Sequence, residues 1–173
     1  MIKGWQLVSS AVMVAGLSQA SPTDTFMVSA TITPGCLINQ EIPSNGTLLG
    51  MIGSLAFGTA SALSQDMHSA SLVTSSAFTL SCTPGTPLTL RVDGGQQWDV
   101  ERQLKRVNGN ETLAYQLYQD AALQNAIGIS QPVSIDTSTT PDNITLPIWG
   151  RLMLPGNLPA GSYSDELLVT LEW

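Results

Sequence analysis

Apolar and polar residues alternate in several short stretches of this chain, and a period of two residues is typical of β-strands. Near the start, the apolar set of one such stretch is Phe26, Val28, Ala30 and Ile32. The chain closes on a second set, Leu167, Val169, Leu171 and Trp173. Further candidate strands cover residues 55–58, 78–82, 88–92, 113–118 and 144–148. The pattern therefore predicts many short strands.

Glycine and proline separate these candidate strands, most clearly at Asp93-Gly94-Gly95. Residues 60–70 are small and polar, which predicts a loop, and residues 120–126 allow a helix of two turns at most. A run of mixed charge at residues 99–106 is expected to form an exposed face or a hairpin. Close turns between short strands favour an all-β sandwich in one domain over an α/β fold.

Charged residues make up only 11% of the 173 residues, and the net charge is −7. So low a charge content argues against a coiled coil or a disordered acidic chain. The acidic balance provides no basic surface for nucleic acid, so no nucleic-acid partner is expected.

The first twenty residues have the pattern of a secretory signal peptide. Lys3 precedes the apolar stretch 7–17, and the small residues Ser18 and Ala20 flank Gln19 as at a cleavage site. A membrane anchor is the alternative, but the apolar run is about half of the ~20 residues that a spanning helix needs. We therefore expect residues 1–20 to be removed and the mature chain to be exported.

Cys36 and Cys82 are the two cysteines of the chain. In an oxidising compartment two thiols most simply form one disulfide. The chain-entropy model credits a loop of this length with roughly 4 kcal/mol of stability. Two distant cysteines and the single histidine, His68, do not make a metal-ligand set, and a cysteine nucleophile would be silenced by oxidation.

Candidate chemistry is otherwise absent from the pattern. No nucleophile motif organises the serines, His68 and the aspartates. The Asp93-Gly94-Gly95 turn is not followed by ligands at the spacing of a calcium loop. The sequence therefore predicts no catalytic residue, no metal site and no cofactor.

Taken in order, several segments resemble the spore coat protein U domain, which builds subunits of archaic chaperone–usher pili of the Csu type. The resemblance covers nearly the whole mature chain and includes the signal peptide and the two cysteines. The segments that carry it are Leu55-Ala56-Phe57-Gly58, Leu80-Ser81-Cys82-Thr83, Arg91-Val92-Asp93-Gly94-Gly95, residues 113–122 and residues 159–165.

This resemblance implies an incomplete immunoglobulin-like β-sandwich that is completed by donor-strand exchange. It divides the mature chain into an N-terminal donor segment, residues 21–35, and a pilin domain, residues 36–173. The implied partners are a periplasmic chaperone, an outer-membrane usher and neighbouring subunits, and the implied location is a pilus on the cell surface. A sandwich that lacks a strand exposes apolar side chains and unpaired backbone groups, which strand addition covers.

In that scheme Phe26, Val28, Ala30 and Ile32 are the donor side chains. The alternative is an ordinary first strand that pairs within its own domain, and alternation is the same in both cases. Leu167, Val169, Leu171 and Trp173 would form the edge of the groove and the pairing site of the chaperone. The alternative there is a core strand that happens to end the chain.

The predicted function is that of a structural pilus subunit, either in the rod or as a minor adaptor, that supports attachment and biofilm formation. A donor-like tail and a single domain fit these positions better than a two-domain tip adhesin. Two alternatives are a self-contained secreted binding module, with every strand paired in its own domain, and a spore-coat component with the same fold.

Overall fold

The structure is a computed structural model that describes residues 26–173. The chain forms two units, Met1–Ile32 and Thr33–Trp173, and each is described by itself. The predicted signal peptide, residues 1–20, lies outside the described residues. Between residues 26 and 173 the backbone forms strands, turns and irregular segments, and no helix. This part of the chain accordingly has no helix that could cross a membrane.

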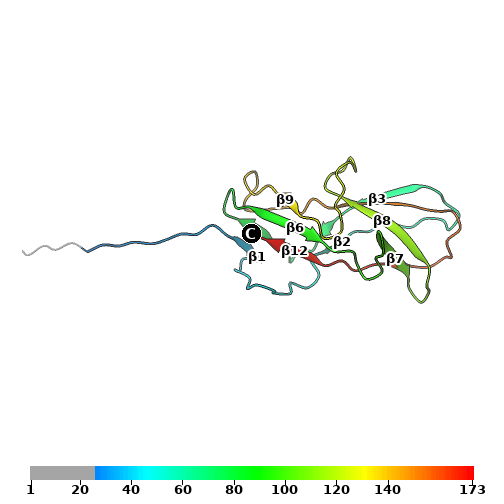
Figure 1. Cartoon of the computed structure of the whole chain (residues 1–173), viewed down its shortest axis with the longest axis horizontal. Coiled ribbons are helices and arrows are strands. Elements are labelled where there is room, and N and C mark those ends of the chain that lie inside the picture. Colours follow the sequence, from blue (N-terminus) through cyan, green and yellow to red (C-terminus); the bar gives the residue numbers. More distant parts are fainter. Residues whose placement is uncertain (1–25) are drawn as a thin grey trace, which may run out of the picture. The chain divides into compact units, whose positions relative to one another are not determined.

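Every strand of residues 26–173 lies in the second unit (Figure 1). In chain order they are β1 (Cys36–Ile38), β2 (Gly53–Ser54), β3 (Met67–Ser71), β4 (Val73–Thr74), β5 (Leu80–Cys82), β6 (Leu88–Val92), β7 (Arg102–Arg106), β8 (Thr112–Tyr118), β9 (Val133–Ile135), β10 (Trp149–Met153), β11 (Tyr163–Ser164) and β12 (Val169–Glu172).

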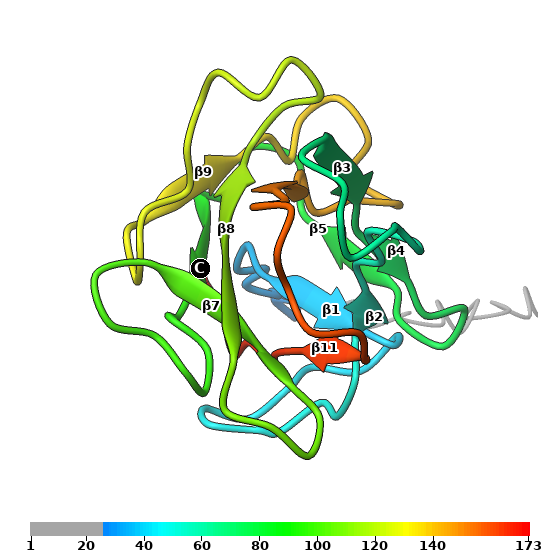
Figure 2. The same cartoon turned by 90° about the vertical axis from the view of Figure 1, so that its right-hand side faces the viewer.

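The strands pair antiparallel in four sheets. The largest has the order β11-β7-β8-β10-β3, and a three-stranded sheet has the order β12-β6-β9. The pairs β1-β5 and β2-β4 complete the set. Viewed from one end, strands of the different sheets surround a common interior (Figure 2). The predicted all-β sandwich is confirmed.

The inward-facing side chains of β6 and β8 supply much of the core. On β6 these are Leu88, Leu90 and Val92, which are almost completely buried. On β8, Leu113, Tyr115 and Leu117 alternate with the less buried Ala114 and Gln116, and Tyr118 at the end of the strand is buried as well. Each buried aliphatic side chain of this size stabilises the fold by about 1.5–3 kcal/mol. The predicted strands 88–92 and 113–118 are both present.

Cys36 and Cys82 form the predicted disulfide. They face each other in the register of β1 and β5, so the bond ties β1 to its partner strand in their two-stranded sheet. Both residues are buried, at 3% and 8% exposure.

Removing this bond is expected to lower the free energy of unfolding by about 2–4 kcal/mol, because the unfolded chain loses a cross-link. Urea unfolding of the oxidised and reduced protein measures the difference. Reductant should have no further effect on a double Cys36→Ser, Cys82→Ser variant. Two reactive thiols in the untreated native protein would contradict the bond.

Two predicted strands are wrong, although their side chains pack as the pattern indicated. Residues 144–148 form no strand, yet Ile144, Leu146 and Ile148 are about 95% buried. Residues 55–58 also form no strand, and Leu55 and Phe57 lie against Gly150 of β10. Alternation reports which side chains face inward, whereas a strand also needs a neighbouring backbone to pair with.

The predicted loop 60–70 and the possible helix 120–126 need correction as well. Residues 67–71 form β3, a polar edge strand that pairs with β10 and alternates only weakly in hydrophobicity. His68, expected in a solvated loop, is a half-buried strand residue instead. Residues 120–126 form turns, and Leu123 has a left-handed backbone with φ of 57°.

The charged run at residues 99–106 contains β7, which forms the expected hairpin with β8. Its first residue, Arg102, is 4% exposed, so the expectation of an exposed face is wrong at this position. The guanidinium donates hydrogen bonds to backbone carbonyls of Val92, Asp93, Ile127 and Gly128. These four acceptors satisfy the buried cation, whose pKa is nevertheless lowered by burial.

Residues 26–32 of the first unit have no assigned strand. Phe26, Val28 and Ile32 are 86%, 83% and 92% exposed, and Ala30 is exposed too. The alternating stretch therefore carries no strand in this structure. A lone extended segment has no ladder of hydrogen bonds until another backbone lies beside it.

Candidate functional site

The candidate site is a groove of about 480 Å³ that runs along β12. One wall consists of residues 168–173, and the other consists of residues 42–49 with Ile52. Ile38 of β1 and Phe78 also line the groove. We call this feature the β12 groove.

The floor of the β12 groove is apolar. Ile38 is 5% exposed, and Ile52, Phe78, Val169 and Leu171 are half-buried residues that pack against the core. Glu172 is the one ionisable side chain of the lining, and it is paired at 3.2 Å with Arg91. The groove therefore suits an uncharged apolar segment.

The second wall carries apolar side chains in the open. Ile42 and Leu48 are 82% and 87% exposed, and they flank a turn in which Thr47 donates its backbone N–H to Ser44 at 3.1 Å. Gly46 in this turn has a φ of 77°, which favours glycine. Exposed aliphatic side chains beside an apolar groove are typical of a surface that receives another segment.

Strand β12 has an open edge on this groove. It is the outermost strand of its sheet, paired only with β6 among the described residues. Asp93 donates its backbone N–H to the carbonyl of Leu168 at 3.1 Å. This bond shows which residues of β12 point their backbone groups toward β6. Because alternate residues bond to one neighbour, the backbone groups of Val169 and Leu171 point away from β6. They are available to a further strand.

Of the predicted groove-edge residues Leu167, Val169, Leu171 and Trp173, the last three line the β12 groove, and Leu167 lies outside its lining. Leu167, Val169 and Leu171 are half-buried and pack against the core. Trp173 is 43% exposed, and its Nε1 would lie 3.9 Å from a Cβ placed on Gly35, immediately before β1. β1 pairs with β5 alone among the described residues, so a second incompletely paired strand begins close to the end of β12.

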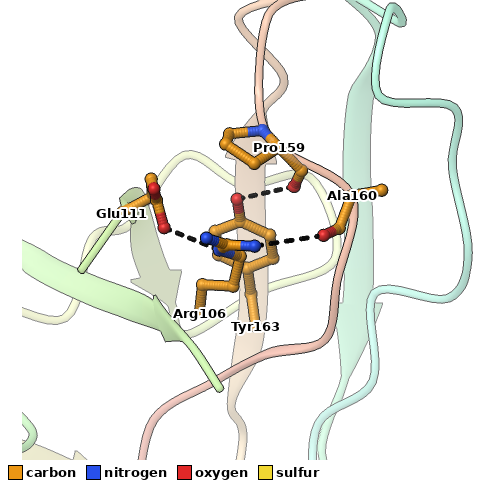
Figure 3. A network of polar contacts seen from close by, with 5 residues as sticks. All are labelled: Arg106, Glu111, Pro159, Ala160 and Tyr163. Carbon is orange, nitrogen blue, oxygen red and sulfur yellow. Dashed lines mark hydrogen bonds and ion pairs between the residues drawn. The ribbon is translucent and has the colours of Figure 1, made fainter. Parts of the chain in front are cut away.

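A polar corner holds the chain that leads into β12 (Figure 3). Tyr163 of β11 donates its hydroxyl to the carbonyl of Pro159 at 2.9 Å, four residues upstream. Arg106 lies between Glu111, at 2.6 Å, and the carbonyl of Ala160, at 3.5 Å. A tyrosine that bonds back to the backbone in this way is a hallmark of immunoglobulin-like sandwiches.

The ion pair in this corner shifts both groups toward their charged forms. The hydrogen bond from Arg106 lowers the pKa of the Glu111 carboxyl, and the same bond raises the pKa of Arg106. Both side chains are partly exposed to solvent, so the ion pair contributes little to the stability of the fold.

The family model of the Spore Coat Protein U domain matches residues 22–170. The chain belongs to this family. The segments that carried the resemblance in the sequence lie in or beside strands of the second unit: Cys82 ends β5, Arg91 and Val92 end β6, and Tyr163 begins β11. A search of curated proteins finds no match for this Spore Coat Protein U domain.

Two solved structures similar to the Spore Coat Protein U domain chain are chaperone complexes. One is the CsuC–CsuE chaperone–tip adhesion subunit pre-assembly complex of the archaic chaperone-usher Csu pili of Acinetobacter baumannii, with 19% identity and a TM-score of 0.49. The other is a chaperone–tip adhesin complex of CFA/I fimbriae biogenesis, with 16% identity and a TM-score of 0.38. They cover 83% and 80% of this chain, which spans about 40% of the length of each.

Sequence reasoning missed the second wall of the groove in this Spore Coat Protein U domain. Residues 42–49 contain proline, asparagine and glycine and give no periodic signal that would mark them as part of a site. The available signal was the presence of Ile42, Leu48 and Leu49 in an otherwise polar loop. Large aliphatic residues in a turn-rich segment need a partner surface, either in the core or outside the chain.

Proposed function

We propose that this chain is a structural subunit of a chaperone–usher pilus and that it polymerises by donor-strand complementation. Residues 26–33 of one copy would enter the β12 groove of the next. The added strand would bond to the open edge of β12 while its apolar side chains cover the groove floor. The open edge of β12 beside an apolar groove is the observation that carries this proposal.

The donor segment has the chemistry that this groove requires. Phe26, Val28, Ala30 and Ile32 lie on one side of an extended chain, and Met27, Ser29, Thr31 and Thr33 lie on the other. No charged residue occurs between Asp24 and Glu41. An uncharged strand loses little hydration free energy on entering an apolar groove, whereas a buried charge costs several kcal/mol.

The same groove explains why such a subunit would need delivery. An unpaired edge and an open apolar surface favour uncontrolled association. A periplasmic chaperone would fill the groove first, with Leu167, Val169, Leu171 and Trp173 at the contact, and an outer-membrane usher would then exchange it for the donor of the next subunit. We assign residues 1–20 to the signal peptide, residues 21–35 to the donor segment and residues 36–173 to the pilin domain.

In this proposal the assembled protein lies in a pilus on the cell surface, in the rod or as a minor adaptor, where it supports attachment and biofilm formation. The role is structural, and the proposal includes neither catalysis nor a cofactor.

The test compares the mature chain, residues 21–173, alone and with a synthetic peptide of residues 22–33, here called the donor peptide. Refolded chain should form assemblies whose mass rises with concentration in light scattering after gel filtration. Excess donor peptide should cap them at a single copy, and a scrambled peptide should not. A lasting monomer that ignores the donor peptide would contradict the proposal and support a self-contained binding module.

A further inference from the structure

Two half-buried carboxylates, Asp93 and Asp165, hold the chain just before β12. Asp93 follows the last residue of β6, and Asp165 follows the last residue of β11. Together they accept hydrogen bonds from three backbone N–H groups and one hydroxyl. We call this pair the Asp93–Asp165 clamp.

At the end of the β6–β12 ladder, the side chain of Asp93 accepts the hydrogen bond that its backbone carbonyl would accept in a regular ladder. Its Oδ1 accepts the N–H of Leu168 at 2.9 Å and the N–H of Gly95 at 3.0 Å. The backbone carbonyl of Asp93, which a regular ladder would offer to Leu168, accepts instead from Arg102 at 2.7 Å. Because of this substitution, the position of Leu168 depends on a carboxylate rather than on the backbone alone.

Asp165 ties the chain before β12 to the turn after β6 and to β8. Its Oδ1 accepts the N–H of Gln96 at 2.9 Å, and its Oδ2 accepts the hydroxyl of Tyr115 at 2.7 Å. Gly95 has a φ of 81°, and a Cβ at this position would overlap the Asp165 carboxylate. The glycine turn therefore admits the carboxylate, and Tyr115, a core residue of β8, anchors it.

We propose that the Asp93–Asp165 clamp positions β12 for strand capture while the groove is empty. This inference rests on the proposed function. A terminal strand with one hydrogen-bonded edge opens more readily than a strand paired on both edges. Capture requires Val169 and Leu171 in register, and apparent affinity falls with the fraction of molecules in the competent arrangement. The clamp acts immediately before these residues and keeps that fraction high.

A filled groove depends less on the clamp, because the incoming strand holds the second edge of β12. Loss of the clamp should therefore weaken capture, since it destabilises the empty form more than the filled form. A clamp residue with a general structural role would destabilise both forms equally and leave the affinity for the donor peptide unchanged.

The experiment measures the concentration of fluorescent donor peptide that half-saturates the refolded mature chain at low protein concentration. Asp93→Ala is expected to raise this concentration about tenfold, the effect of losing net hydrogen bonding of about 1 kcal/mol or more. Asp93→Asn keeps the Oδ1 acceptor and should bind the peptide as the wild type does.

Asp120→Ala is the matched control. Asp120 also accepts two backbone N–H groups, from Gln124 and Asn125, in a loop outside the groove lining. It should leave peptide binding unchanged. Hydrogen exchange gives the second readout. In the empty chain, the amides of Thr170 and Glu172, which point toward β6, should exchange faster in Asp93→Ala than in Asp120→Ala, and peptide should remove the difference.

If Asp93→Ala does not fold, Tyr115→Phe decides the matter, because it removes only the hydroxyl that anchors Asp165 and should weaken binding about threefold. Wild-type chain that binds the donor peptide, with clamp variants that bind equally well, overturns the clamp and leaves the proposed function standing. Wild-type chain that does not bind the peptide overturns both.

Discussion

Aspartate in place of Phe26 or Ile32 is expected to stop polymerisation of the mature chain. Each substitution removes an apolar side chain whose burial is worth about 1.5–3 kcal/mol and brings a carboxylate to an uncharged groove. Since about 1.4 kcal/mol corresponds to a tenfold change, affinity should fall at least 100-fold. Light scattering of the refolded variants should show single copies where the wild type forms assemblies.

The matched control is aspartate at Ser29 or Thr31, on the opposite face of the same extended segment. It adds the same charge but leaves the apolar set intact, so assemblies should persist. The grooves of the Phe26 and Ile32 variants are unaltered, and these variants should still bind the wild-type donor peptide. Normal assemblies from Phe26→Asp and Ile32→Asp would contradict the donor assignment.

Aspartate in place of Leu171, in the groove that accepts the donor strand, is expected to abolish binding of the donor peptide. Leu171 faces Leu90 of β6, which is completely buried, and its side chain forms part of the groove floor. A carboxylate there would be held against the core without a cation. Peptide binding should weaken at least 100-fold, and circular dichroism should establish whether the chain remains folded.

Two further variants complete this comparison. Ser134→Asp adds the same charge at an exposed position of β9, outside the groove lining, and should bind the peptide as the wild type does. Leu171→Ala removes the apolar contact without adding charge and should weaken binding about tenfold, even if Leu171→Asp is too unstable to measure. Wild-type binding by Leu171→Ala would show that the peptide does not occupy the β12 groove.

The alternating stretches show which features of this protein the local sequence pattern predicts. At residues 88–92 and 113–118 the alternation coincides with the strands β6 and β8, because both strands have a hydrogen-bonded neighbour on each side. At residues 144–148 the same alternation predicts which side chains are buried but not the backbone pairing. At β3 the backbone pairs although the side chains alternate weakly, because pairing with β10 depends on position in the sheet.

The Asp93–Asp165 clamp and the second groove wall could not be predicted from the sequence for a related reason. Asp93 was recognised as part of a turn, but its bond to Leu168 joins residues 75 positions apart. Asp165 meets Tyr115 across 50 positions, and Arg102 is buried because four carbonyls from two distant segments converge on it. Contacts of this range arise only when the sheets pack.

The sequence by itself determined the all-β class, the main core strands, the Cys36–Cys82 disulfide and the alternating apolar set at residues 26–32, since these follow from local periodicity and from residue chemistry. Only the tertiary structure decided which strand edges remain without a partner and which loop borders them. Backbone hydrogen-bonding capacity is the same at every residue other than proline, so an open edge is a property of how strands are arranged and cannot be read from their composition.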